Sequence, residues 1–380
     1  EATYEYGGAA REALAGAIDA RGRRSLWDFA ALFPLPEGTA PISLGEGGTP
    51  LVLGDWLAEW AGHSTAGVYL KNETANPTWC SKDRGNSLSV AVAKALGAPG
   101  TVAITTGNHG ASVVAYSARA GLPSVALMNP LSDVVHRAMV AECGGTGIVT
   151  SDPVAYLRRL VQEDGWFAVT SMAEESGPNP YGVEAYKTIA YEVLADLGGV
   201  PDAVFVAAAS GDLLFGIEKG FRELRELGLA DRVPRMIGCQ AAGAAPLAQA
   251  RREGLSEVPV LPSPATVAVS IGDATGGAHA LDAVAGSGGD FAVVSDAEIV
   301  EAQHVLARGG LLIETASSAT AAGLRSAAKV GLVRPGERVV LILSGSAVKW
   351  SEQLISAALG GSGRVLLEPG LGSLDVAIAR

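Results

Sequence analysis

The sequence is poor in charge and in long apolar stretches, and each shortage excludes a class of protein. Charged residues make up only 18% of the 380 residues, against roughly a quarter in typical soluble domains. No basic run occurs among them and the formal net charge is −12, which argues against a nucleic-acid-binding protein. No apolar run approaches the roughly 20 residues of a membrane span, so no membrane partner is expected.

Cysteine is equally scarce. Cys80, Cys143 and Cys239 show no CxxC pairing, which predicts free thiols in a reducing compartment and hence a cytoplasmic protein. No metal site is expected. The sequence shows no signal peptide, and its start at Glu1 rather than at Met predicts a trimmed or processed chain.

The sequence does contain a regular alternation of short apolar runs and longer amphipathic segments. This alternation predicts βαβ units and a mostly parallel sheet. Strands are expected at 67–73, 101–106, 123–129, 147–151, 202–209, 234–240 and from 338, helices at 83–97, 111–121, 133–145, 183–199, 296–308 and 316–328, and a loop followed by a helix at 210–228. The segment 253–280 has little periodicity and predicts long loops, which are often functional.

Three loops that follow predicted strands carry polar residues where open α/β sheets bind ligands. TTGNHG, residues 105–110, combines hydroxyls with a helix N-terminus and suits a carboxylate or a phosphate. AASGDLLFG, residues 208–216, suits a single phosphate group, because it lacks the Walker lysine and the GxGxxG spacing of ATP and NAD sites. LSGSAVK, residues 343–349, presents Ser344. Each loop alone is equally well explained as an ordinary turn.

Lys82 adds an amine to this set. It lies at the start of a predicted helix, where the helix dipole disfavours a cation. We therefore expect a lowered pKa and a neutral amine, the form that builds Schiff bases. A lone lysine at such a position is usually a solvated charge, but pyridoxal phosphate needs all four kinds of partner that these segments offer.

At these motifs the chain resembles the fold-type II pyridoxal-phosphate enzymes (the tryptophan synthase beta-like superfamily), and most closely the threonine synthase family. The resemblance covers nearly the whole chain. It rests on seven segments in order: SLGEGGTPL (43–51), LKNETANPTWCSKDRG (70–85), TTGNHGAS (105–112), NPYGVEAYKTIAYEV (179–193), SGDLLFGI (210–217), ETASSATAAGL (314–324) and LSGSAVK (343–349).

The resemblance implies a two-domain α/β fold of mostly parallel, twisted sheets flanked by helices, with the active site in the interdomain cleft. Residues 1–89 and 181–380 would form the larger domain, which binds the cofactor phosphate. Residues 90–180 would form a smaller, mobile α/β domain.

The resemblance also implies pyridoxal 5'-phosphate as the cofactor and a role for each matched residue. Lys82 would hold the cofactor as a Schiff base and then act as the base at Cα. Asn108 would bond its phenolic oxygen and Ser344 its ring nitrogen. The phosphate is expected on the loop residues Ala209, Ser210, Gly211, Asp212 and Leu213, and the substrate on Thr105, Thr106, Gly107, Ser81 and Lys187.

The sequence departs from the family pattern at three places. The Gly-Ser-Phe that precedes the family's lysine is here Trp79, Cys80 and Ser81, and Ala209 replaces a glycine. SIGDATGG, residues 270–277, lacks the Arg-Ile and the proline of the family's SIRIGNP-like run. Such segments line the substrate side in this family, so the departures weigh against O-phosphohomoserine as the substrate.

These features predict a threonine synthase-like enzyme of amino-acid metabolism that catalyses elimination or replacement at Cβ or Cγ of an amino acid. Conversion of O-phosphohomoserine to threonine is one version, and a β- or γ-replacement in secondary metabolism is another. A threonine or serine ammonia-lyase and a catalytically degenerate binding protein stay open as alternatives. The leaving group, the nucleophile and a homodimeric assembly stay open as well.

Overall fold

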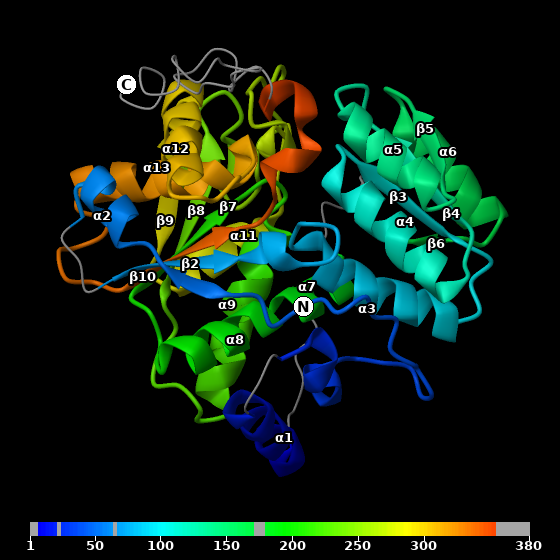
Figure 1. Ribbon diagram of the computed structural model, residues 1–380, viewed down its shortest axis with the longest axis horizontal. Coiled ribbons are helices and arrows are strands. Elements are labelled where there is room, and N and C mark those ends of the chain that lie inside the picture. The colour runs from blue at the N-terminus through cyan, green and yellow to red at the C-terminus, as the bar shows by residue number, and fades with distance from the viewer. Residues whose placement is uncertain (1–6, 21–23, 64–66, 171–178, 355–380) are drawn as a thin grey trace, which may run out of the picture.

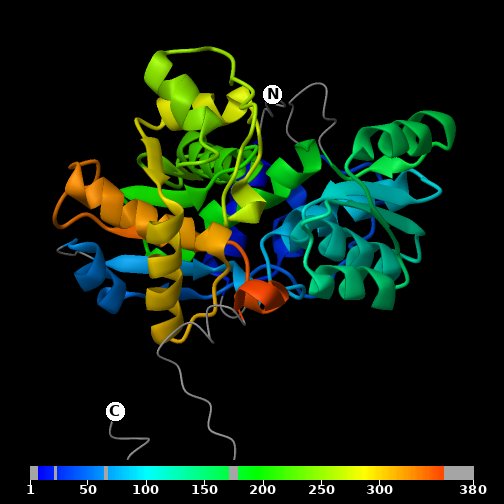
Figure 2. The ribbon, with the colours of Figure 1, turned by 90° about the horizontal axis from the view of Figure 1, so that it is seen from above.

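The computed structural model describes residues 7–20, 24–63, 67–170 and 179–354. These residues form two lobes, each built on its own sheet (Figures 1 and 2). The larger lobe holds a six-stranded sheet in the order β1-β2-β10-β7-β8-β9, and the smaller a four-stranded sheet in the order β5-β4-β3-β6. All strand pairs are parallel except that of β1 with β2. The predicted α/β fold with mostly parallel sheets is confirmed.

Helices cover both faces of the larger sheet. Alternate residues of β7 explain why: Val204 and Val206 face one apolar cluster, while Ala203 and Phe205 face the other. A parallel strand buried on both faces reads as a continuous apolar run. The strands are β1 (Leu51–Leu53), β2 (Val68–Asn72), β7 (Ala203–Ala207), β8 (Arg235–Ala241), β9 (Asp290–Val294) and β10 (Val339–Leu343).

Two groups of helices enclose this sheet. One apolar cluster joins it to α1 (Gly8–Asp19), α7 (Pro180–Tyr186), α8 (Thr188–Leu197), α9 (Asp212–Glu226), α10 (Pro246–Glu253) and α11 (Ala278–Gly286). The other joins it to α2 (Asp55–Ala61), α12 (Asp296–Arg308) and α13 (Thr315–Lys329). Where one helix was expected over 183–199, the structure has two, α7 and α8, which meet at Lys187.

The smaller lobe is a second βαβ arrangement. Its strands are β3 (Thr101–Thr105), β4 (Ser124–Met128), β5 (Thr146–Val149) and β6 (Phe167–Ala168), and its helices are α4 (Asn108–Ala120), α5 (Val134–Glu142) and α6 (Pro153–Arg158). Apolar side chains of α4 and α5 pack on one face of the sheet, and Leu157 of α6 packs on the other. None of the helices in the described part of the chain is both long and apolar enough to span a bilayer.

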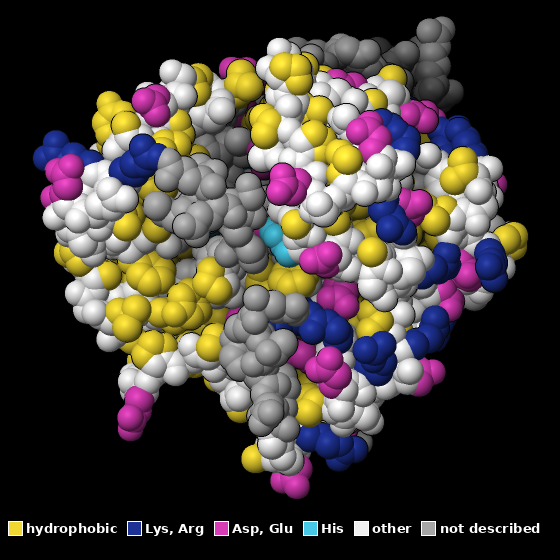
Figure 3. Space-filling model, turned by 180° about the vertical axis from the view of Figure 1, so that it is seen from behind, with side chains coloured by type: hydrophobic (Ala, Val, Ile, Leu, Met, Phe, Trp, Pro, Cys, Tyr) yellow, Lys and Arg dark blue, Asp and Glu magenta, His cyan; other side chains and the backbone are white. Residues whose placement is uncertain are grey.

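Helix α3 (Lys82–Ala95) joins the two lobes, because it packs against α4 of the smaller lobe and α7 of the larger. The expected domain boundary at residue 90 lies inside this helix. The division into two domains, and the mobility of the smaller one, stay predictions. The segment 254–277 contains one short helical turn, Val269–Ile271, as its weak periodicity suggested. Charges of both signs are interspersed on the face shown in Figure 3, without a continuous basic surface.

A buried ion cluster fixes the start of α3. The Arg84 guanidinium is fully buried and donates to both carboxylate oxygens of Glu73, each at 2.8 Å. It also donates to both oxygens of Glu192 in α8, at 2.6 and 2.8 Å. Lys71 Nζ lies 2.8 Å from Glu192 Oε2. Burial raises the pKa of Glu192, but Arg84 and Lys71 outweigh it and hold that pKa well below its usual range.

We predict that Arg84→Gln lowers the free energy of unfolding by about 3–5 kcal/mol, because two buried carboxylates lose their partner. Equilibrium unfolding in urea measures this loss. The gap between the variant and the parent protein should narrow as the pH falls below about 4.3, the ordinary pKa of glutamate, since the depressed pKa of Glu192 contributes stability only above it.

The matched control is Arg159→Gln. Arg159 pairs with Asp164 at 4.0 Å, with side chains 72% and 43% exposed, so its loss should cost less than about 1 kcal/mol. Equal destabilisation by both substitutions would contradict a special role for the buried cluster.

Candidate active site

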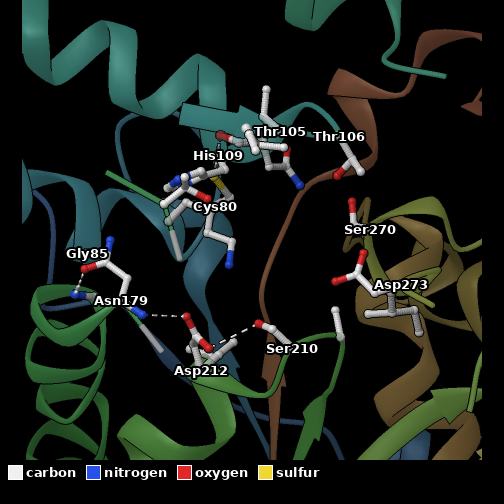
Figure 4. Close-up of a pocket in the computed structure, with 18 of the residues that line it drawn as sticks. Cys80, Gly85, Thr105, Thr106, His109, Asn179, Ser210, Asp212, Ser270 and Asp273 are labelled. Atoms are coloured by element: carbon white, nitrogen blue, oxygen red, sulfur yellow. Dashed lines mark hydrogen bonds between the residues drawn. The ribbon is translucent and has the colours of Figure 1, made fainter. Parts of the chain in front are cut away.

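A cavity of about 540 Å³ opens between the two lobes. It lies where parallel strands of both sheets end, as expected for open α/β sheets. In the larger sheet, Leu343 of β10 pairs with Asn72 of β2, so these strands end at the same edge. Figure 4 shows Thr105 and Thr106 on the small-lobe side of the cavity, with Asp212 and Ser210 below and Ser270 and Asp273 at the right.

The structure brings most of the predicted site residues together in this cavity. Those that line it are Ser81, Lys82, Thr105, Thr106, Asn108, Ala209, Ser210, Gly211, Asp212, Leu213 and Ser344. They come from the start of α3, from the turn between β3 and α4, from the loop between β7 and α9 and from the end of β10. Their roles stay predictions, but their convergence from four separate segments is a structural fact.

Two predicted substrate residues do not line the cavity. Lys187 is fully buried in the larger lobe, where its Nζ donates to the Leu32 carbonyl at 2.8 Å and contacts Glu184 and Glu223. This ion cluster explains the lysine, so its assignment to the substrate is corrected. Gly107 donates its N–H to Thr105 Oγ1 at 2.8 Å, and that N–H is therefore already used.

Lys82 reaches the cavity from the first residue of α3. Its Nζ lies 5.6 Å from the ring centroid of Tyr186. Tyr186 raises the pKa of Lys82, and together with Asp212 it outweighs the opposing effect of burial. The lowered pKa expected from the helix dipole is therefore wrong for the ligand-free protein, because nearby oxygen-bearing side chains stabilise the ammonium form.

Asp83 holds the loop that carries Lys82. Its carboxylate accepts the backbone N–H and the hydroxyl of Thr78, and also the hydroxyl of Ser112 in α4. Burial raises the pKa of Asp83 to about 6, although these donors oppose the rise. Asp83 thus bonds the start of α3 to the smaller lobe, and the next residue, Arg84, bonds the same helix to the larger lobe.

The loop before α9 fits a phosphate group. The N–H groups of Ser210, Gly211 and Asp212 have no acceptor within the described residues, and no side chain caps the helix. Gly211 has a φ of 99°, and a Cβ there would lie 2.3 Å from the Cβ of Ala280. Free N–H groups at a helix N-terminus bind anions well. The observed loop therefore fits the phosphate of pyridoxal phosphate.

Asp212 turns its carboxylate towards protein donors. It accepts from His279 Nε2 and Ser210 Oγ, both at 3.2 Å, and from the Asn179 N–H at 3.3 Å. Burial raises the pKa of Asp212, but His279 and Lys82 outweigh this effect and lower it. The carboxylate is therefore ionised, and Figure 4 shows it bonded to Asn179 and Ser210.

Asn108 and Ser344 are held by neighbours outside the predicted set. Asn108 Nδ2 donates to Glu314 at 2.8 Å and its Oδ1 lies 3.1 Å from His136 Nε2. Ser344 Oγ lies 2.7 Å from Ser317 Oγ. One amide hydrogen of Asn108 is left to donate into the cavity, as a partner of a phenolic oxygen requires.

The unusual residues before Lys82 differ in their placement. Trp79 has a φ of 60° and is 45% exposed, and it does not line the cavity. A left-handed backbone favours glycine, which explains the glycine of the related motif at this position. A substrate-side role for Trp79 is therefore corrected. Cys80 does line the cavity, but burial raises its pKa, so it stays a thiol rather than a nucleophilic thiolate.

Sequence reasoning missed several residues that line the cavity. Tyr186 lies next to Lys82. In the segment 179–193 the resemblance pointed only to Lys187 as a site residue. Ser270 and Asp273 lie in SIGDATGG, the segment 270–277 that the resemblance places on the substrate side, but neither residue was among the predicted site residues. His109 also lines the cavity. Burial lowers the pKa of His109 to about 4, so this imidazole is neutral near pH 7.

Comparison with known proteins agrees with this geometry. Residues 42–345 match the family model described as pyridoxal-phosphate dependent enzyme. A threonine synthase of Methanosarcina acetivorans is 34% identical over 340 residues, which cover 87% of this chain and 82% of the relative. A threonine synthase of Mycobacterium bovis is 35% identical over 325 residues, covering 83% and 86%.

A solved structure shares the fold at lower identity. The diaminopropionate ammonia lyase of Escherichia coli superposes with a TM-score of 0.72 and 17% identity, covering 95% of this chain and 94% of its own. The predicted resemblance, fold class and cofactor are all confirmed. This chain belongs to the family of pyridoxal-phosphate-dependent enzymes and is threonine synthase-like within it.

Proposed function

We propose that this enzyme eliminates or replaces a group at Cβ or Cγ of an amino acid, with pyridoxal phosphate bound to Lys82. One observation carries the proposal: the amine of Lys82 and the free N–H groups of the 210–212 loop face the same cavity. When bound, the cofactor supplies an electron sink that stabilises negative charge at Cα. The remaining tasks, which are binding, orientation and proton movement, belong to side chains and N–H groups of this chain.

Proton movement at Cα falls to Lys82. Its amine is the one amine among the described residues that line the cavity, and a base must lie within hydrogen-bond reach of the proton that it takes. Tyr186 lies beside it, and burial raises the pKa of this phenol. Tyr186 therefore stays protonated and acts as a hydrogen-bond partner that positions Lys82.

The carboxylate of the substrate fits the N-terminus of α4. Thr105 Oγ1 accepts the N–H groups of Gly107 and Gly110, at 2.8 and 2.9 Å, and so fixes the turn. The N–H groups of Asn108 and His109 have no acceptor within the described residues. The N–H groups of Asn108 and His109 would therefore bind the substrate carboxylate, in place of the N–H of Gly107. Thr106 supplies a hydroxyl at the same edge of the cavity.

The proposal extends to the organisation of the chain. Residues 1–89 with 181–380 are assigned to a larger domain and 90–180 to a smaller, mobile one, which the separate sheets support.

Cys80, Cys143 and Cys239 are free thiols, in keeping with a cytoplasmic enzyme. The substrate is a free amino acid.

We predict that Lys82→Ala loses covalent attachment of the cofactor. The purified protein should show a visible cofactor absorbance band, and borohydride reduction should fix the cofactor to the peptide that contains Lys82. In the variant the band should shift or disappear, because no other amine of the described residues lines the cavity. Lys94→Ala is the control, since Lys94 lies exposed in the same helix. An unchanged band in Lys82→Ala would refute this attachment.

We also predict that the enzyme exchanges the Cα hydrogen of its substrate with solvent deuterium. Proton NMR of amino acids incubated with the enzyme in D₂O reports this exchange, and Lys82→Ala should slow it by at least about 100-fold, the usual contribution of a positioned base. Release of ammonia with a 2-oxo acid would instead identify an ammonia-lyase. Absence of exchange with every amino acid tested would favour a protein that only binds ligand.

A further inference from the structure

The cavity has an uneven balance of charge. Among the described residues that line it, Lys82 is the sole lysine or arginine, whereas Asp212, Asp273 and Glu314 are all carboxylic acids. His109 adds no positive charge near pH 7, since its pKa is lowered to about 4. The space around the substrate is therefore short of cations.

Two of the three carboxylates already have protein partners. Asp212 accepts from His279, Ser210 and Asn179, as described above. Glu314 accepts from Asn108 Nδ2 at 2.8 Å and from the Trp350 indole at 2.7 Å. Each is occupied in holding another part of the site.

Asp273 differs, because it makes no hydrogen bond or ion pair with any described residue. It follows the Val269–Ile271 turn, and its carboxyl group projects into the cavity (Figure 4). Asp273 is an exposed residue of the cavity wall. Partial loss of hydration raises its pKa, Lys82 lowers it and Asp212 raises it. These three charged groups therefore act on the same space.

Ser270 provides a second, independent observation beside it. Its hydroxyl oxygen is buried, with less than 1 Å² accessible, and it has no hydrogen-bond partner among the described residues. Buried polar groups are normally paired. Figure 4 shows Ser270 and Asp273 on the same side of the cavity. A hydroxyl and a carboxylate that both lack partners within the described part of the chain, on one side of the cavity, suit a ligand that donates hydrogen bonds.

We propose that Asp273 and Ser270 bind the end of the substrate side chain and select an amino acid that carries an ammonium or hydroxyl group there, against one that carries a phosphate ester. The inference rests on the proposed function, since it concerns the substrate of the same cavity. The cofactor phosphate and the substrate carboxylate already bring negative charge to the site. A second phosphate would meet Asp273 without any arginine or further lysine among the described lining residues to balance it.

Equilibrium binding to the cofactor-loaded protein tests this selection. Calorimetry and the change in cofactor absorbance give dissociation constants at pH 8 for two matched series. One series is 2,3-diaminopropionate, serine and O-phosphoserine; the other is 2,4-diaminobutyrate, homoserine and O-phosphohomoserine. In at least one series the amine or the alcohol should bind about tenfold or more tightly than the phosphate ester. The order of amine and alcohol shows which donor the site prefers.

Asp273→Asn keeps the size of the side chain and removes its charge. It should weaken binding of the preferred amine or alcohol about tenfold and strengthen binding of the phosphate ester. Asp282→Asn is the control, because Asp282 is an exposed residue of α11 outside the cavity, and it should leave all constants unchanged.

The outcomes separate this inference from the proposed function. Failure to load cofactor on Lys82 would overturn the proposed function. A loaded protein that binds the phosphate esters most tightly, binds none of the six compounds, or responds equally to Asp273→Asn and Asp282→Asn would overturn the inference while leaving cofactor binding intact.

Discussion

The site depends on the buried ion pairs of Arg84. This guanidinium joins Glu73, which follows β2, to Glu192 in α8, and each carboxylate receives two hydrogen bonds from it. Fully desolvated charges are tolerated only with complete pairing and good geometry. The position of α3 relative to the larger sheet is thereby fixed within narrow limits, and α3 carries Lys82 at its first position.

Three consecutive residues of α3 contact three different parts of the molecule. Lys82 faces the cavity, Asp83 bonds Ser112 of the smaller lobe, and Arg84 bonds the core of the larger lobe. Successive side chains on an α-helix point about 100° apart, so one helical turn reaches the ligand space and both lobes. The start of α3 is therefore the joint at which the two sheets and the reactive amine are held together.

Polar groups around the cavity are arranged largely by one another. The Thr105 hydroxyl shapes the turn before α4, Glu314 and His136 fix the amide of Asn108, and His279 holds the carboxylate of Asp212. Such contacts orient groups before a ligand arrives, which lowers the cost of binding. Among the described lining residues few polar groups are left without protein partners, and the proposed substrate selection rests on these.

Local pattern in the sequence determined much of this protein: many of the strands and helices, the polar loops at strand ends, and Lys82 at the start of α3. It missed the short strands β1 and β6, the edge strand β9 and several helices, among them α10 and α11. Hydrophobic periodicity and turn residues act over short distances along the chain, so they can be recognised in the sequence without knowledge of the fold. Tertiary structure alone decided that Lys187 lies in a separate buried cluster, that Trp79 lies outside the cavity lining, and that Tyr186 lies within it. It also reversed the expected pKa shift of Lys82. The physical reason is that side-chain direction and electrostatic surroundings depend on residues that are distant in sequence and meet only in the folded chain.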